Sequence, residues 1–314
     1  CIAMENINLP ITGICSFAKY PVCTDLDQLD AHIGVLGIPY DQGAAWYGGQ
    51  RLGPRGIRNI STAYARGSAG FYDPEKDEFL LAAPVKVADC GDVDILHGDP
   101  GYCFSSIEKT VRKVLKKGTI PALMGGDHSV SIPAARALDC LSEPVNIIQF
   151  DAHLDFSMAR GPQKFGNGNP IRRMSEMPHI GKIVQIGMRG LGSSSRQDWQ
   201  DARKENTVIT AKQFHSMSLS ELVEKIPEGK AYITFDIDAY DISLMPATAA
   251  PSPGGLLYEE TTELLTEICK KAEVLGFDMV ETAPPYDTPG HTGCRLAALT
   301  MLHIMGQIMK YKQP

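Results

Sequence analysis

Six short apolar runs recur along the 314-residue chain and constrain its fold more than any other feature. Each run is nearly continuous in hydrophobicity, as expected of parallel strands that are buried on both faces. The runs are IGVLGI (33–38), IPALM (120–124), VNIIQF (145–150), IVQIGM (183–188), YITF (232–235) and VLGFDMV (274–280).

Amphipathic stretches separate these runs and predict helices. Residues 105–117 and 259–272 have helical periodicity, and the segment from Arg295 to Met309 is typical of a largely buried helix. Alternating strands and helices indicate an α/β domain with a parallel sheet that is covered on both sides. We therefore expect a single domain over residues 1–314, with residues 1–30 as an N-terminal extension.

Composition excludes several classes of protein. The formal net charge of −7 argues against a protein that binds a nucleic-acid backbone. No apolar run approaches the roughly 18 to 20 residues needed to cross a bilayer. The first ten residues lack a secretory signal, and the eight cysteines form no CxxC pair. We expect a cytoplasmic protein with reduced thiols that binds neither nucleic acid nor membrane.

Polar clusters directly follow four of the apolar runs. They are GGDHS (125–129), DAHLD (151–155), DIDAYD (236–241) and ETAPPYD (281–287). In parallel sheets, ligands bind outside the carboxyl ends of the strands, so these clusters are expected at one edge. A lone Asp or His after a strand is more often a helix cap or turn residue than a ligand. The conjunction of the clusters is what indicates a shared site.

Alternating residues at a strand end can share one face, so the acids and imidazoles of these clusters could converge. Without cations, so many carboxylates would repel one another and raise their own pKa values. Two divalent ions would remove that conflict. The candidate ligands are His128, Asp151, His153, Asp155, Asp236 and Asp238.

Together with GIPYDQGAAWYGGQRLGPRGIR (37–58), these motifs resemble the ureohydrolases, the family that includes arginase and agmatinase. The resemblance implies a three-layer α/β/α fold with an eight-stranded, mostly parallel sheet. It also implies a hydrolase of C–N bonds in linear amidines, with a small cationic guanidino compound as substrate. Family members are usually trimers or hexamers, so we expect a homo- or hetero-oligomer, with a paralogous chain as one candidate partner.

The resemblance also implies the roles of the candidate ligands. One ion would be held by His128, Asp151, Asp155 and Asp236, and the other by His153, Asp151, Asp236 and Asp238. Oxygen-rich mixed ligation suits Mn²⁺, some similar members use Ni²⁺, and the ligand types do not decide between them. A water bridging the two cations would become hydroxide near neutral pH and attack the guanidinium carbon.

Four further acids have implied roles. Glu281 matches the family acid that holds the guanidinium through a charge-assisted pair. Asp155 counts among the catalytic residues as well as among the ligands. Asp127 and Asp241 are expected to orient ligands instead of binding metal.

The chain departs from the family pattern at Asn167, in NGNP (167–170), where family members carry a His assigned to proton transfer. Asn has no ionisation near neutral pH that could replace it. Three explanations remain open. The chain could be a weakened or regulatory subunit of an active paralogue, His291 in TPGHTG could take the role, or the substrate could need less help in protonating its leaving group. We favour the last two, because all six ligands are present.

A second departure is ISLMPATAAPSPGG (242–255), which lacks the glycines that agmatinases carry there. This segment resembles the branch that contains guanidine hydrolases and biguanide (metformin) hydrolases. We therefore expect guanidine or a biguanide as substrate, ahead of agmatine. Trp46 or Tyr47 could line the pocket through cation–π contact, or could simply pack within the N-terminal loop.

Overall fold

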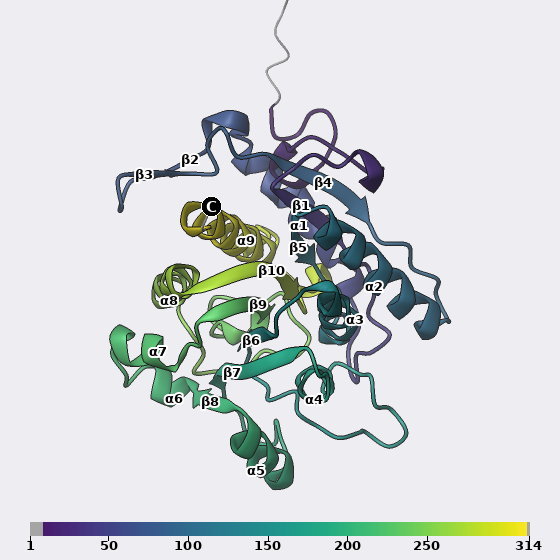
Figure 1. Cartoon of the computed structure of the whole chain (residues 1–314), viewed down its shortest axis with the longest axis vertical. Coiled ribbons are helices and arrows are strands. Elements are labelled where there is room, and N and C mark those ends of the chain that lie inside the picture. Colours follow the sequence, from purple (N-terminus) through teal and green to yellow (C-terminus); the bar gives the residue numbers. More distant parts are fainter. Residues whose placement is uncertain (1–8, 313–314) are drawn as a thin grey trace, which may run out of the picture.

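Eight parallel strands form the central sheet of the computed structural model, in which residues 9–312 are described (Figure 1). Their order is β4-β1-β5-β10-β9-β6-β7-β8, and every pair of neighbours is parallel. The strands are β1 (Ile33–Gly37), β4 (Val87–Asp92), β5 (Ile120–Met124), β6 (Val145–Phe150), β7 (Ile180–Met188), β8 (Thr207–Thr210), β9 (Gly229–Asp236) and β10 (Ala272–Val280).

Helices cover both faces of this sheet, which confirms the predicted three-layer α/β/α fold. One layer contains α1 (Gly53–Ser61), α6 (Ala211–Phe214), α7 (Leu219–Lys225), α8 (Tyr258–Lys271) and α9 (Thr292–Tyr311). The other contains α2 (Pro100–Lys116), α3 (Ser131–Arg136), α4 (Pro170–Ser175) and α5 (Arg196–Glu205).

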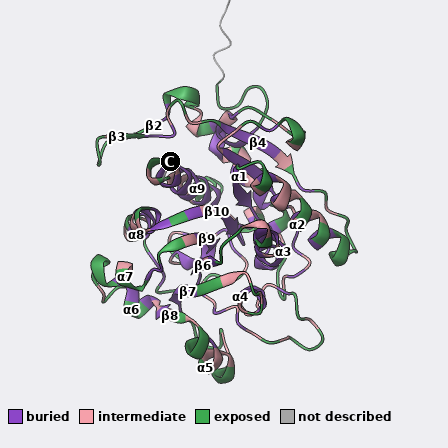
Figure 2. Ribbon diagram, in the orientation of Figure 1, coloured by how far each residue is buried: buried purple, intermediate pink, exposed green. Residues whose placement is uncertain are grey.

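Two hydrophobic cores lie between these layers, because successive strand residues point to opposite faces. In β6, Ile148 and Phe150 join the core under α8 and α9, whereas Val145 and Ile147 join the core under α2 and α3. Figure 2 shows the buried strands at the centre of the molecule and exposed residues on the outer sides of the helices. None of the described helices combines the length and apolar character needed to cross a bilayer.

The predicted elements are confirmed, and the sheet contains two strands that were not predicted. All six apolar runs lie in strands, and the predicted helices lie in α2, α8 and α9. The missed strands, β4 and β8, are the two edges of the sheet. β4 reads VADCGD and is only half apolar, while β8 has just four residues. A separate hairpin joins β2 (Phe71–Asp73) to β3 (Glu78–Leu80).

Part of the expected N-terminal extension packs against the sheet edge; its first eight residues lie outside the described part of the chain. Phe17 is fully buried, and its backbone N–H donates to Asp89 Oδ2 over 2.7 Å. Val22 forms a parallel bridge with the same residue, Asp89. Residues 17–22 are therefore fixed to β4.

Candidate metal centre

The four strands that carry the polar clusters are consecutive in the centre of the sheet, in the order β5-β10-β9-β6. Because they are parallel, their carboxyl ends meet at one edge, as the sequence predicted. The GGDHS cluster is positioned by a close contact between its own backbone and the backbone of Tyr40. Asp127 N–H donates to Tyr40 O over 2.8 Å, and a Cβ on Gly126 would lie 1.6 Å from that oxygen. Only glycine fits there, so the GGDHS turn can deliver His128 to the edge.

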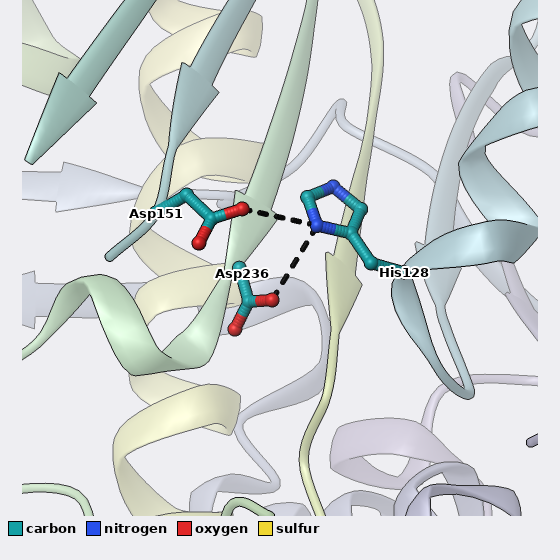
Figure 3. Close-up of side chains that lie close together, drawn as sticks. All are labelled: His128, Asp151 and Asp236. Atoms are coloured by element: carbon teal, nitrogen blue, oxygen red, sulfur yellow. Dashed lines mark ion pairs between the residues drawn. The ribbon is translucent and has the colours of Figure 1, made fainter. Parts of the chain in front are cut away.

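His128 lies at the centre of the first group of ligand atoms. Its Nδ1 is 2.8 Å from Asp155 Oδ2, 3.1 Å from Asp151 Oδ2 and 3.4 Å from Asp236 Oδ2. Figure 3 shows the ring facing Asp151 and Asp236, which come from the neighbouring strand ends. Nδ1 is buried and makes no well-aligned hydrogen bond. An orphaned imidazole nitrogen facing three carboxylates is the donor set expected of a divalent-cation site.

His153 forms the second group. Its Nδ1 is 2.9 Å from Asp238 Oδ2 and 3.5 Å from Asp151 Oδ1. Ligand atoms of Asp151, His153 and Asp238 lie within 4.8 Å of one another, as do those of His128, Asp151 and Asp236. Asp151 therefore belongs to both groups, with one oxygen toward each imidazole. The structure brings all six candidate ligands together.

The electrostatics of the cluster show the conflict that cations would relieve. Burial, and then the charge of Asp151, raise the pKa of Asp155 to about 7. Burial and the charges of Asp238 and Asp151 raise the pKa of Asp236 well above its ordinary value. The surrounding carboxylates raise the pKa of His128 well above its ordinary value, although burial opposes them. The bare cluster therefore favours retained protons, which bound cations would displace.

A chain of hydrogen bonds orients His128 from behind. Its Nε2 lies 2.9 Å from Thr234 Oγ1, which donates to Asp278 Oδ1 over 2.7 Å. Tyr232 donates to the other oxygen of Asp278 over 3.0 Å. With Thr234 accepting from Nε2–H, the tautomer leaves Nδ1 free to bind a cation.

Amides and a guanidinium hold the other side of the cluster. Gln149 Nε2 donates to Asp151 Oδ2 over 2.6 Å, and its Oε1 accepts from Gln185 Nε2 over 2.7 Å. Arg189 Nη2 donates to the backbone carbonyls of Asp238 and Tyr240 over 2.7 and 3.0 Å. The two turns are also bonded to each other, because the backbone N–H of Ala152 donates to Asp238 Oδ1 over 3.0 Å. The DAHLD and DIDAYD turns are therefore fixed relative to each other.

Glu281 lies beside the cluster with an almost fully buried side chain and a left-handed backbone, at φ 63°. Its Oε1 accepts from the backbone N–H of His128 over 2.8 Å. Its Oε2 accepts from Gln50 Nε2, also over 2.8 Å. Burial raises the pKa of Glu281, while these donors oppose the shift. The result is a buried acceptor site next to the candidate ligands.

Asn167 contacts Glu281. Its Nδ2 donates to Glu281 Oε1 over 3.3 Å, and its backbone N–H donates to Gly43 O over 3.0 Å. His291, the other proton-transfer candidate, is exposed and precedes α9 with φ 55°. Among the described residues, its ring has no hydrogen bond or ion pair with the cluster. The structure thus brings Asn167 to the site and leaves His291 outside it.

The remaining candidates lie around the centre. Asp127 accepts from Ser129 and Gly43, and Asp241 accepts from Ser243 and Gly255, so both fix turns. Trp46 is 78% exposed and Tyr47 57% exposed. Their rings contact each other at 5.4 Å between centroids, and Tyr47 also contacts Tyr286 at 6.1 Å.

A cavity of about 330 Å³ opens beside the cluster. Asp155 and Asn167 line it, so the cavity adjoins both the candidate ligands and the neighbour of Glu281. Its lining also includes the polar residues Ser193, Ser194, Ser195 and Asp198. This arrangement leaves room for a polar substituent next to the cluster.

Four residues at the site were not predicted from the amino-acid sequence: Gln50, Gln149, Thr234 and Arg189. A signal existed for two of them, because Gln149 and Thr234 are polar residues inside the apolar runs VNIIQF and YITF. Such residues seldom lie in a strand buried on both faces unless they bond a specific partner. Gln50 and Arg189 lie outside the apolar runs, and their partners are distant in sequence.

Known proteins that are similar to this chain define its family. The model of the arginase family matches residues 31–306. The chain is 33% identical to mitochondrial agmatinase of Gallus gallus over 299 residues, covering 92% of this chain and 84% of that protein. It is 33% identical to guanidinobutyrase of Pseudomonas aeruginosa over 295 residues, 89% of this chain and 88% of that protein. The solved structure of proclavaminate amidino hydrolase from Streptomyces clavuligerus matches with a TM-score of 0.83 at 27% identity, over 96% of this chain and 99% of that one. The chain therefore belongs to the arginase family, as an agmatinase-like ureohydrolase that acts on C–N bonds of linear amidines.

Proposed function

We propose that this ureohydrolase cleaves a C–N bond of a guanidino-type compound with the help of two divalent ions, Mn²⁺ or Ni²⁺. The observation that carries the proposal is the buried, orphaned Nδ1 of His128, which faces three carboxylate oxygens. The proposed ligands are His128, Asp151, His153, Asp155, Asp236 and Asp238. Bound there, two cations would supply an activated water as the nucleophile.

The chain's own residues would bind and orient the substrate. Glu281 is buried and already surrounded by N–H donors, so it can stay anionic and attract a planar cation. A guanidinium group offers only donors, which matches a carboxylate acceptor. The contact of Glu281 with the backbone of His128 would place that cation directly beside the ligands.

Within this class we rank guanidine or a biguanide such as metformin first. The segment 242–255 departs from the agmatinase pattern, and it lies next to Glu281, because Ala283 N–H donates to Ala247 O over 2.7 Å. Met245 and Ala247 are fully buried there. A difference in the sequence of this segment could therefore alter which cationic head group binds to Glu281.

A guanidino compound with a polar tail, such as agmatine, is the second candidate. The cavity beside Asp155 and Asn167 would accommodate such a tail, and the serines that line it would bind an amine or a carboxylate. Similarity to an agmatinase and a guanidinobutyrase supports this candidate. The third candidate is a regulatory subunit in a trimer or hexamer with an active paralogue, motivated by Asn167.

The test is a substrate panel. Protein stripped of metal and reloaded with Mn²⁺ or Ni²⁺ is incubated with guanidine, metformin, agmatine and 4-guanidinobutyrate, and urea or guanylurea is measured. We expect turnover of guanidine or metformin to exceed that of the two tailed compounds. Faster turnover of a tailed compound would reverse the ranking. Absence of turnover on the whole panel, with two ions bound per chain, would overturn the proposed function, and activity restored by a paralogue would favour the regulatory role.

A further inference from the structure

Gln50 carries an unsatisfied acceptor next to the proposed substrate-binding acid. Its side chain is fully buried, and Oε1 has no hydrogen-bond partner among the described residues. Its Nε2 donates to Glu281 Oε2 over 2.8 Å and to Tyr47 O over 3.2 Å. Both neighbours of Nε2 are acceptors, so a flipped amide would set oxygen against oxygen. The amide orientation is therefore defined, and Oε1 is the free atom.

The backbone around Gln50 is fixed by Asp41. Asp41 Oδ2 accepts from the N–H groups of Gly49 and Arg51 over 2.8 and 3.3 Å, and Oδ1 accepts from Arg51 Nε over 2.6 Å. Gly49 has φ 121°, which strongly favours glycine. Tyr286 further ties this turn to the loop after Glu281, because its hydroxyl donates to Gly48 O over 2.8 Å. The Gln50 amide is therefore held in place before any ligand binds.

Two side chains bonded to Glu281 or next to it carry a buried atom without a hydrogen-bond partner among the described residues. These atoms are Gln50 Oε1 and His128 Nδ1, and the latter faces only carboxylate oxygens. Buried polar groups without partners are rare in folded proteins and call for a partner such as an ion, water or ligand. Cations account for His128 Nδ1. Gln50 Oε1 needs a hydrogen-bond donor instead.

We propose that Gln50 is a substrate-binding residue whose Oε1 accepts an N–H of the cationic head group that Glu281 binds. This inference rests on the proposed function. The amide and the carboxylate would form a joint acceptor for a planar group with donors only, which is the chemistry of guanidinium and biguanide cations. Urea, the product of cleaving a guanidine, is neutral, has fewer N–H donors and carries a carbonyl oxygen, so it matches this pair of acceptors less well. Gln50 would thus favour substrate over product at the same site.

The experiment compares Gln50→Met with Gln307→Met on the full-length, metal-loaded protein. Met is unbranched, similar in size to Gln and unable to replace either hydrogen bond. Gln307 is the matched control, because its amide is also fully buried and unpaired but lies in the last part of α9, away from Glu281. Metal content and unfolding temperature are measured for each variant, and Gln50→Leu replaces Gln50→Met if the latter does not fold.

We expect Gln50→Met to lower kcat/KM for the best substrate of the panel by roughly 10- to 100-fold, mainly through KM. The inhibition constant of urea should stay unchanged or fall, because the variant lacks the Oε1 atom that would repel the carbonyl oxygen of urea. Gln307→Met should match the wild type within about twofold. A loss of substrate and urea affinity in parallel would instead indicate a structural role and overturn the inference.

Kinetics of Gln50→Met within twofold of the wild type would also overturn it, while wild-type turnover would leave the proposed function standing. If the wild type turns over no guanidino compound, the proposed function fails first, and the inference fails with it.

Discussion

Asn167 donates a hydrogen bond to Glu281, with 3.3 Å between Nδ2 and Oε1. Asn167, which the sequence resemblance sets where a proton-transferring His is expected, therefore touches the acid that is proposed to bind the substrate. Since an amide does not ionise near neutral pH, this contact can steady a carboxylate but cannot carry a proton. We therefore predict that Asn167 positions Glu281 and does not transfer a proton.

Substitution of Asn167 tests this assignment. Asn167→Asp would set a second carboxylate against Glu281, so we expect kcat/KM for a cationic substrate to change with pH in a way the wild type does not. Asn167→Ala removes only the hydrogen bond and should cost roughly 3- to 10-fold in kcat/KM. Steady-state kinetics between pH 6 and 9 measure both effects. Wild-type kinetics in both variants would show that the contact has no role in turnover.

Removal of metal should destabilise the fold, and substitution of a ligand that belongs to one group only should remove one of the two ions. At free metal near 100 times Kd, each bound ion would add about 3 kcal/mol to the free energy of unfolding, which a chelator would remove. Asp238 contacts His153 and belongs to the second group only. We therefore expect Asp238→Asn to lower metal content from two ions per chain to one, measured by elemental analysis. An unchanged unfolding temperature on chelation would argue against a metal centre.

The hydroxyl of Thr234 should control metal affinity without touching metal. It lies 2.9 Å from His128 Nε2 and donates to Asp278 over 2.7 Å. Thr234→Val keeps the shape but frees the imidazole and leaves Asp278 with one partner fewer. We expect a 10- to 100-fold weaker affinity for one of the two ions. Thr300 lies in α9, and Thr300→Val, which removes its bond to the Tyr240 hydroxyl, is the control and should leave metal affinity unchanged. Equal affinities in the two variants would contradict the prediction.

His291 should prove dispensable for proton transfer. Its ring is exposed and has no bond to the cluster among the described residues, and its backbone has φ 55°. Asn tolerates this conformation well, so His291→Asn removes the imidazole with little strain. We expect kcat to change by less than about threefold across the pH range. A tenfold loss that also removes one limb of the pH profile would restore His291 as the proton carrier.

His303 should make the fold sensitive to acid. Burial lowers its pKa to about 4, against 6.5 for the exposed group. Between these values the unfolded chain binds a proton that the folded chain does not, so stability falls as the pH drops through this window, by up to about 3 kcal/mol. His303→Gln has no such titration. Denaturant unfolding at pH 7 and pH 4.5 measures the effect. From pH 7 to pH 4.5, the free energy of unfolding should fall less in His303→Gln than in the wild type, and an equal fall in both proteins would disprove the effect.

The sequence sufficed for the centre of the fold and for the ligand cluster. Both rest on local patterns, because an apolar run followed by alternating acids specifies a buried strand and its carboxyl end together. The edge strand β8 was not predicted because it has only four residues and is partly buried, so its sequence need not be apolar. The edge strand β4 is mostly buried but contains two aspartates, so it does not read as an apolar run. In β4, Asp89 and Asp92 instead bind Arg58 of α1.

Contacts between distant segments could not be predicted in the same way. Gln50 and Glu281 are 231 residues apart, and Asn167 and Glu281 are 114 apart. Whether such residues meet depends on strand order and loop paths, which no local periodicity encodes. Family resemblance predicted Glu281 as the substrate-binding acid, and that role is still a proposal, whereas its amide partners required the structure.

The position of β10 has a consequence for synthesis of the protein. It is the last strand in the chain, yet it lies in the middle of the sheet, between β5 and β9. Until it leaves the ribosome, the earlier strands can form only two half-sheets, each with an open edge that invites pairing with other chains. Nascent chains that stall before residue 272 should therefore be prone to aggregate and depend on chaperones.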